Sequence, residues 1–277
     1  MMRSILLGLD DSPFRPAVIE LGIRWAKRFD AGLVGLGVID RPRISRPEPV
    51  PPGGGAFKVE ADRQRLTDAR QQIESWLDEF RTRVAEAGVP GKAIEATGDP
   101  EQQIRLTSHS HDVILLGHRT YFRFETQKGP CNTLEEVLHN APRPVVTVPE
   151  SLPATDTVML AYDGSLQAAR TVQQFVYSGL GDGVDVHVVT IAEDQDEAKA
   201  KAERAVEFLS HHGIKARCDA FAQKGSPANM LLGQAERINA GLMVLGAYGR
   251  TTLHDFFLGS VTKKILHAAT VPLFLYH

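Results

Sequence analysis

The stretch of sequence that decides the fold is Leu242-Met243-Val244-Leu245-Gly246-Ala247-Tyr248-Gly249, followed after nine residues by Gly259-Ser260-Val261-Thr262. An apolar run that ends in glycines and leads to a helix starting with glycine and hydroxyl residues is typical of parallel α/β proteins that bind phosphate. Glycine lets the backbone approach a ligand closely, and the N–H groups at a helix N-terminus attract anions. The stretch therefore predicts a phosphate site.

The chain as a whole repeats once. Residues 5–12 correspond to residues 158–165, and each segment is an apolar run followed by an aspartate and a serine. Three more matches follow in the same order: Gly98 with Gly225, residues 113–117 with 242–246, and Leu138-His139 with Leu266-His267. Four ordered matches predict two related domains, which we place at residues 1–149 and 154–277, joined by a polar, proline-bearing linker. These are the first and second repeat below.

Each repeat has five apolar runs separated by helical patterns. In the second repeat the predicted strands are 157–162, 185–191, 215–221, 242–246 and 271–276. Continuous apolar strands are typical of a parallel sheet that is covered on both faces, and strands that alternate with helices predict a doubly wound α/β fold. Ser165 is the expected N-cap of the helix after the first of these strands.

The first repeat is longer because of one insertion after its second strand. Its residues 41–60 are rich in proline and glycine, which predicts a solvated loop, with a lid or partner loop as the alternative. The helix that follows has Leu66, Ile73, Phe80 and Ala87 at intervals of seven. We favour a helix lying on a sheet over a coiled-coil seam.

Composition excludes several classes of protein. The 277 residues carry a net charge of −3, which gives no reason to expect nucleic acid or lipid as a partner. No apolar run approaches the roughly 20 residues that span a bilayer. The two cysteines, Cys131 and Cys218, have no metal-type spacing, which favours a reducing cytoplasm. His109 and His111 have no identifiable third ligand, and we predict no metal site.

The predicted ligand site of the second repeat lies where its first and fourth strands end, at Asp163 and Gly246. The Asp163 carboxylate suits ribose or base donors, or a divalent cation that accompanies phosphates; its alternative role is a partner for a helix dipole. Neither a Gly-x-x-x-x-Gly-Lys-Ser/Thr motif nor a Gly-x-Gly-x-x-Gly motif after the first strand is present.

The spacing of Gly246, Gly249, Gly259 and Ser260, with Asp163 at the end of a first strand, resembles the universal stress protein family. Because the likeness covers both repeats, the chain is similar to tandem members of that family. The resemblance implies two flavodoxin-like, five-stranded parallel sheets of order 3-2-1-4-5. It also implies that the last strands, 144–148 and 271–275, pair to make a pseudo-dimer, and it leaves a homodimer open.

The same resemblance implies a site for ATP, with ADP or AMP as alternatives and Mg²⁺ as a possible companion. The residues that it assigns to this site belong to the second repeat: Ala161, Tyr162, Asp163, Ile191, Leu245, Gly246, Gly249, Gly259, Ser260, Val261 and Thr262. No catalytic residue is implied. The leading hypothesis is therefore a nucleotide-binding stress-response or regulatory module. A slow ATPase or phosphotransferase, or a nucleotide-free scaffold, are the alternatives.

The first repeat departs from the glycine pattern. Thr120 stands opposite Gly249, and Cys131-Asn132 stand opposite Gly259-Ser260. A β-branched residue resists the backbone conformations that glycine tolerates, and Cys131 adds bulk where a phosphate is expected. We predict a degenerate nucleotide site in this repeat. Asp10 and Ser12 remain, which leaves a nucleoside or other small ligand open.

Overall fold

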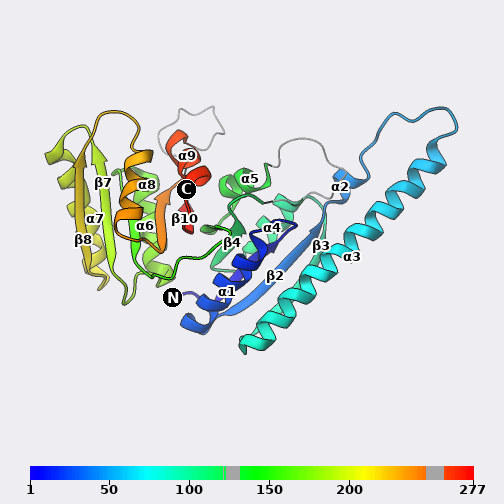
Figure 1. Cartoon of the computed structure of the whole chain (residues 1–277), viewed down its shortest axis with the longest axis horizontal. Helices are drawn as coiled ribbons and strands as arrows, with labels where there is room; N and C mark the ends of the chain where they lie inside the picture. The colour runs from blue at the N-terminus through cyan, green and yellow to red at the C-terminus, as the bar shows by residue number, and fades with distance from the viewer. Residues whose placement is uncertain (121, 123–131, 248–258) are drawn as a thin grey trace. The chain divides into compact units, whose positions relative to one another are not determined.

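The computed structural model describes residues 1–120, 122, 132–247 and 259–277. The chain divides into two compact units, one formed by Arg3–Val137 and the other by Met1–Met2 with Leu138–His277. Each unit is an α/β structure with a mostly parallel sheet (Figure 1). The predicted fold class, a doubly wound and flavodoxin-like α/β fold, is confirmed.

The unit Arg3–Val137 contains four parallel strands in the order β3-β2-β1-β4. The strands are β1 (Ser4–Leu9), β2 (Gly32–Ile39), β3 (Gly91–Thr97) and β4 (Val113–Gly117). Its helices are α1 (Arg15–Phe29), α2 (Arg41–Ile44), α3 (Gly55–Ala87), α4 (Pro100–Ser108) and the beginning of α5 (Thr133–Asn140).

The unit Leu138–His277 contains the strand order β8-β7-β6-β9-β10-β5. Its strands are β5 (Val145–Val148), β6 (Val158–Ala161), β7 (Val186–Ala192), β8 (Ala216–Ala222), β9 (Leu242–Gly246) and β10 (Leu273–Tyr276). Its complete helices are α6 (Leu166–Ser178), α7 (Gln195–His211), α8 (Ala228–Arg237) and α9 (Ser260–Ala268). Every strand predicted for the second repeat is present within two residues of its expected bounds.

Strand β5 belongs to the first repeat in sequence but joins the sheet of the second. It runs antiparallel to β10, with Phe274 opposite Val146. The last strands of the two repeats therefore pair, as the resemblance implied, and β10 is covered on the side away from β9. Pairing of this kind removes an exposed strand edge.

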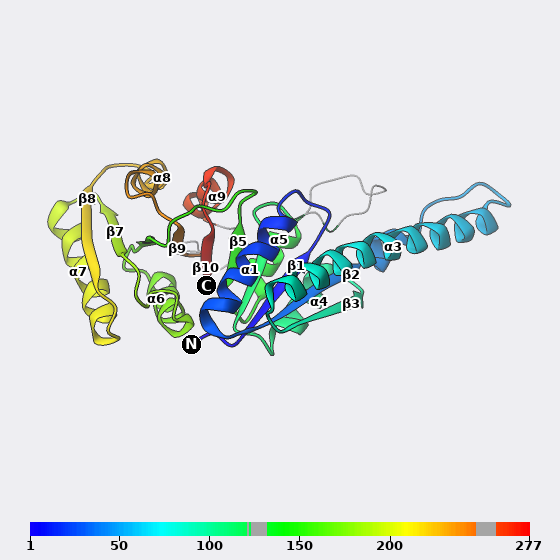
Figure 2. The ribbon, with the colours of Figure 1, turned by 60° about the horizontal axis from the view of Figure 1, so that its bottom comes forward.

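The helices of the second unit form two contacting pairs, α6 with α7 and α8 with α9, on the two faces of the sheet (Figure 2). The core is built from the apolar strands, such as Met243 and Val244 of β9, and from one stripe of each helix. In α6 this stripe includes Ala168, Val172 and Phe175, and in α7 it includes Ala198, Ala202 and Leu209.

The contact between the second strand and the helix that follows it, β2 with α3 and β7 with α7, is packed with different side chains in the two repeats. In the first, β2 has Gly35 and Gly37, and a Cβ added there would lie 2.8 Å from Phe80 and 2.6 Å from Ile73 of α3. In the second, the corresponding strand positions are Val188 and Thr190, and the corresponding helix positions are Ala205 and Ala198. Large side chains on the helix face glycines on the strand in one repeat, and alanines face larger strand residues in the other. Because interiors are close-packed, the total volume is kept while its source changes.

The helix of residues 55–87 lies on its sheet over its second half, as we predicted. Its buried residues run from Ala69 to Val84, while its N-terminal part extends beyond β2 and β3 (Figure 1). The predicted loop over residues 41–60 is wrong at both ends. Residues 41–44 form α2 because the Asp40 side chain accepts a hydrogen bond from the Arg43 N–H (3.2 Å) and Pro42 is tolerated in a first helical turn. Helix α3 already begins at Gly55, directly after a turn closed by Gly54 and Pro51.

Within the described ranges, no helix combines the length and the apolar character that crossing a bilayer requires.

Gly241, just before β9, tests the packing of the second sheet. A Cβ at this position would lie 1.8 Å from the Thr155 carbonyl oxygen, which is backbone and cannot rotate away. We expect Gly241→Ala to lower the free energy of unfolding by about 1–3 kcal/mol. Gly233→Ala is the control, since nothing lies within 4 Å of its added Cβ, and in helix α8 it should raise stability by about 0.5–1 kcal/mol. Chemical denaturation measures both, and equal effects would contradict this packing.

Candidate functional site

The site begins at the carboxyl ends of three neighbouring strands. β6 pairs in parallel with β9 on one side and with β7 on the other. The ends of these strands, at Ala161, Gly246 and Ala192, therefore lie at one edge of the sheet. Strand order reverses between β6 and β9, because the chain moves outward from β6 through β7 to β8 and then returns to β9. Ligands of open α/β sheets bind at such a point.

A cavity of about 610 Å³ lies at this edge. Its volume is within the range of small-molecule sites. The predicted site residues that line it are Ala161, Tyr162, Asp163, Ile191, Leu245, Gly246, Gly259, Ser260, Val261 and Thr262. Gly249, the remaining predicted site residue, lies outside the described residues. Four segments that are far apart in sequence are thus brought together in one place.

Asp163 stands at the mouth of this cavity on a short turn. Its Oδ1 accepts a hydrogen bond from the Ser165 N–H (2.9 Å), and Gly164 between them has a φ of +80°. Ser165 caps α6, as predicted, because its Oγ accepts from the Ala168 N–H (3.1 Å). The turn holds Asp163 exposed to solvent. Its carboxylate can therefore meet a ligand while one oxygen is fixed.

Gly246 has a packing role that the sequence did not indicate. A Cβ at this position would lie 2.9 Å from the Ala168 nitrogen and 3.1 Å from the Gln167 carbonyl carbon. Both atoms are backbone, so the end of β9 and the start of α6 approach each other too closely for any side chain here. The glycine is needed for this contact even before a ligand is considered. The Gly246 carbonyl also accepts a hydrogen bond from the Thr262 hydroxyl (3.4 Å).

The N-terminus of α9 forms the opposite wall of the cavity. Gly259 is its N-cap and provides no side-chain hydrogen bond to the first turn. Ser260 is exposed, whereas Thr262 is buried and its hydroxyl is directed to Gly246. Because residues 259–262 line the cavity, the first turn of the helix offers N–H groups and the positive end of its dipole to that space. Of the two predicted hydroxyl donors, Ser260 is the one available to a ligand.

The structure adds a charged wall that sequence reasoning missed. Glu193, Glu197 and Lys201 line the cavity from the end of β7 and from α7. Lys201 pairs with Glu197 (Nζ to Oε1, 2.6 Å) and its side chain is only 19% exposed. In sequence the two residues look like an ordinary i, i+4 surface pair. Further lining residues are Gln223, Gly225 and Pro227 from the segment between β8 and α8, and Leu231 of α8.

The corresponding helix start in the first repeat has the opposite charge. Counting from the shared Leu-His pair, Lys263 and Lys264 of α9 correspond to Glu135 and Glu136 of α5. Both glutamates lie in the first turn of α5, where carboxylates offset the helix dipole. Cys131, which corresponds to Gly259, lies outside the described residues, and Thr120 is buried. An anion is therefore disfavoured at this helix start.

No group of three or more His, Cys, Asp or Glu side chains suited to a metal is found in residues 1–120, 122, 132–247 and 259–277. His111 is buried, with Nδ1 2.8 Å from the Thr107 carbonyl oxygen. Cys218 lies on β8, outside the cavity lining. Partial burial, and then the charges of Glu203 and Asp219, raise the pKa of its thiol, which makes it a weaker nucleophile at neutral pH.

Comparison with known proteins gives the same family twice along the chain. The profile of the universal stress protein family matches residues 1–149 and again residues 154–277. A universal stress protein of Synechocystis is 24% identical over 163 residues, which is 58% of this chain and 56% of that relative. One of Mycolicibacterium smegmatis is 22% identical over 281 residues, covering 97% of this chain and 95% of the relative. The crystal structure of a universal stress protein from Archaeoglobus fulgidus superposes with a TM-score of 0.73 at 22% identity, covering 99% and 95% of the two chains.

Loss of the Ser165 cap should weaken the turn that presents Asp163. We expect Ser165→Ala to lower the free energy of unfolding by about 1 kcal/mol, because the Ala168 N–H loses its side-chain acceptor. Ser165→Asp keeps an acceptor at the same place and should stay close to the wild type. Denaturant titration measures the difference, and a Ser165→Ala variant as stable as Ser165→Asp would contradict the capping role.

Proposed function

Because this chain belongs to the universal stress protein family, we propose that its second repeat binds an adenine nucleotide, namely ATP or its shorter relatives ADP and AMP. The bound nucleotide would set the state of a stress-response or regulatory module. The observation that carries the proposal is the cavity at the β6–β9 switch point, which is lined by ten of the eleven residues that the family resemblance assigned to a nucleotide. Apolar side chains, the exposed Asp163 carboxylate and the N-terminus of α9 meet there.

The phosphates are assigned to the α9 end of the cavity. Its first-turn N–H groups have no side-chain cap at Gly259, and the Ser260 hydroxyl adds an exposed donor. Lys263 and Lys264 follow in the same turn region and are exposed, so the local charge also favours an anion. These groups recognise phosphate oxygens without counting them, which is why the proposal covers all three nucleotides.

The nucleoside is assigned to the end of the cavity formed by β6 and β7. Ala161 and Ile191 give this end apolar surface for a base, and Asp163 gives an acceptor for ribose hydroxyls. The Asp163 carboxylate also suits a Mg²⁺ ion that arrives with the phosphates, since hard divalent cations prefer oxygen ligands.

The first repeat is proposed to bind no nucleotide phosphate. Its helix start carries Glu135 and Glu136 where the second repeat has two lysines, so phosphate would meet repulsion there. The chain would then hold one nucleotide, and binding would stabilise the second unit by mass action. A regulatory module needs no more chemistry than this, and the proposal includes no catalytic residue.

Ligand carried through purification identifies the class of nucleotide. Mass spectrometry of the small molecules released from denatured protein should show ATP, ADP or AMP. Absence of all three, together with no heat of ATP binding in calorimetry, would contradict the proposal and favour a nucleotide-free scaffold.

A carboxylate placed at the start of α9 should abolish ATP binding. Ser260→Asp adds a negative charge at an exposed N-terminal helix position, where the fold accepts it because of the helix dipole. We expect the Kd for ATP, measured by isothermal titration calorimetry, to rise by at least tenfold.

Asn132→Asp is the matched control, because Asn132 holds the same position before α5 in the first repeat. It should leave the Kd unchanged. Equal affinities for all three proteins would show that the phosphates bind elsewhere.

A further inference from the structure

The two repeats share one hydrogen bond after their first strand, from a serine N–H to the carboxylate of the aspartate two residues earlier. In the first repeat the Ser12 N–H donates to Asp10 Oδ1 (3.3 Å), and in the second the Ser165 N–H donates to Asp163 Oδ1 (2.9 Å). Counted from these aspartates, Arg15 and Ala168 occupy the same position, five residues on. Arg15 is the first residue of α1, whereas Ala168 is the third residue of α6.

The helices α3 and α7 are also in register. Each helix ends with the same pair of backbone hydrogen bonds. At the end of α3, the Gly88 N–H donates to the Ala85 carbonyl and the Val89 N–H donates to the Val84 carbonyl. At the end of α7, the Gly213 N–H donates to the Ser210 carbonyl and the Ile214 N–H donates to the Leu209 carbonyl. Twelve residues before these glycines stand Trp76 and Lys201. Trp76 of the first repeat therefore corresponds to Lys201, a residue that lines the cavity of the second.

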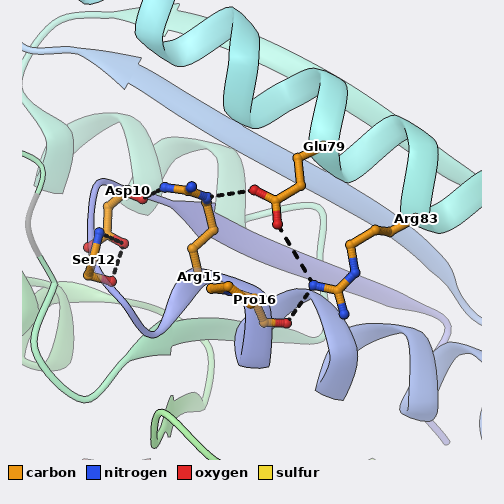
Figure 3. A network of polar contacts seen from close by, with 6 residues as sticks. All are labelled: Asp10, Ser12, Arg15, Pro16, Glu79 and Arg83. Carbon is orange, nitrogen blue, oxygen red and sulfur yellow. Dashed lines mark hydrogen bonds and ion pairs between the residues drawn. The ribbon is translucent and has the colours of Figure 1, made fainter.

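In the first repeat, Arg15 contacts Trp76, and Figure 3 shows the polar contacts that Arg15 makes near the end of β1. The guanidinium carbon of Arg15 lies 5.2 Å from the Trp76 ring centroid. Arg15 Nη1 donates to the Asp10 carbonyl oxygen (2.6 Å), and Nε donates to Glu79 Oε2 (3.0 Å). Arg83 holds Glu79 in place from the other side. Its Nη1 donates to the Pro16 carbonyl oxygen (2.8 Å) and lies 3.9 Å from Glu79 Oε1.

This arrangement covers the strand end. Asp10 is only 2% exposed and Trp76 5%, and the Arg15 side chain is 18% exposed. A planar, polar group thus lies over an aromatic ring and is hydrogen-bonded to the strand-end backbone. These are the contacts that a planar ligand would otherwise require at this place.

In the second repeat the same two positions leave space. Ala168 and Lys201 line the cavity, and Asp163 is exposed where Asp10 is buried. The stem of Lys201 lies beside Gly164, where an added Cβ would be 3.4 Å from three of its carbons, and its ammonium is held by Glu197. The lysine stem thus packs on the turn that follows β6, and its ammonium is paired with Glu197.

We propose that these two paired positions decide which repeat can accept a ligand: Arg15 and Trp76 close the first site with the chain's own guanidinium, and Ala168 and Lys201 keep the second open. This inference rests on the proposed nucleotide binding of the second repeat, and it adds a determinant outside the glycine motif. It also answers the question that Asp10 and Ser12 leave open in the sequence, because the nucleoside end of the first site is already filled.

The test transfers the closing pair to the second repeat. Ala168→Arg combined with Lys201→Trp, in the full chain, should raise the Kd for ATP at least tenfold, although every glycine, Asp163 and Ser260 are untouched. Lys201→Trp alone is the second variant, because it changes a residue of the cavity wall and leaves the buried Ala168 as it is. It should raise the Kd for ATP several-fold. The matched control is Ala169→Arg with Lys199→Trp, the same changes at exposed neighbouring positions, which should leave the Kd unchanged.

If the folded double variant and Lys201→Trp bind ATP with wild-type affinity, the inference is overturned. If the wild type itself binds no ATP, the proposed function fails, and the closed state of the first site is tested separately by fluorescence. In a Trp25→Phe background, acrylamide should quench Trp76 weakly, and Arg15→Ala should raise the quenching constant at least twofold. An unchanged constant would mean that Arg15 does not cover the indole, which overturns the inference on its own.

Discussion

The site of this protein depends on one backbone contact, the close approach of the end of β9 to the first turn of α6. Gly246 has no room for a side chain because an added Cβ would lie 2.9 Å from the Ala168 nitrogen and 3.1 Å from the Gln167 carbonyl carbon. The contact fixes the start of α6, and with it the turn that presents Asp163. On the other side, the Gly246 carbonyl accepts the Thr262 hydroxyl and so ties α9 to the same strand end. One glycine therefore sets the distance between the two walls of the cavity.

The two repeats keep the same scaffold by different means. In the first repeat, Gly35 of the strand faces Phe80 of the helix. In the second repeat, Val188 takes the position of Gly35 and Ala205 takes the position of Phe80. Such exchanges conserve volume between a strand and its helix, so the backbone is retained. Positions near the carboxyl ends of the strands lie outside these paired strand–helix contacts. At these positions the two repeats differ in side-chain size and charge. Trp76 of the first repeat corresponds to Lys201 of the second, and Glu135-Glu136 correspond to Lys263-Lys264. This divergence supports the proposed division into a binding and a closed repeat.

Much of the fold could be predicted from local sequence. The apolar runs gave the strands, since residues buried on both faces leave an unbroken pattern, and Ser165 could be assigned as a cap from its type and position. The glycine spacing and the aspartate at a strand end are local signals, and the family resemblance that they carry assigned the ten described site residues. Glu197 and Lys201 could not be predicted, because they reach the cavity only through the packing of α7 on β7 and β8. The helical turn at 41–44 was missed because proline density concealed the Asp40 cap, and the packing role of Gly246 was missed because its partner lies far away in sequence.

The central claim is that one chain has one open nucleotide site, in its second repeat. Native mass spectrometry of the intact chain at saturating ATP tests it most directly, because the method counts bound ligands. The account predicts a mass increase of a single nucleotide for each chain. A chain that carries two nucleotides, or none, would contradict it.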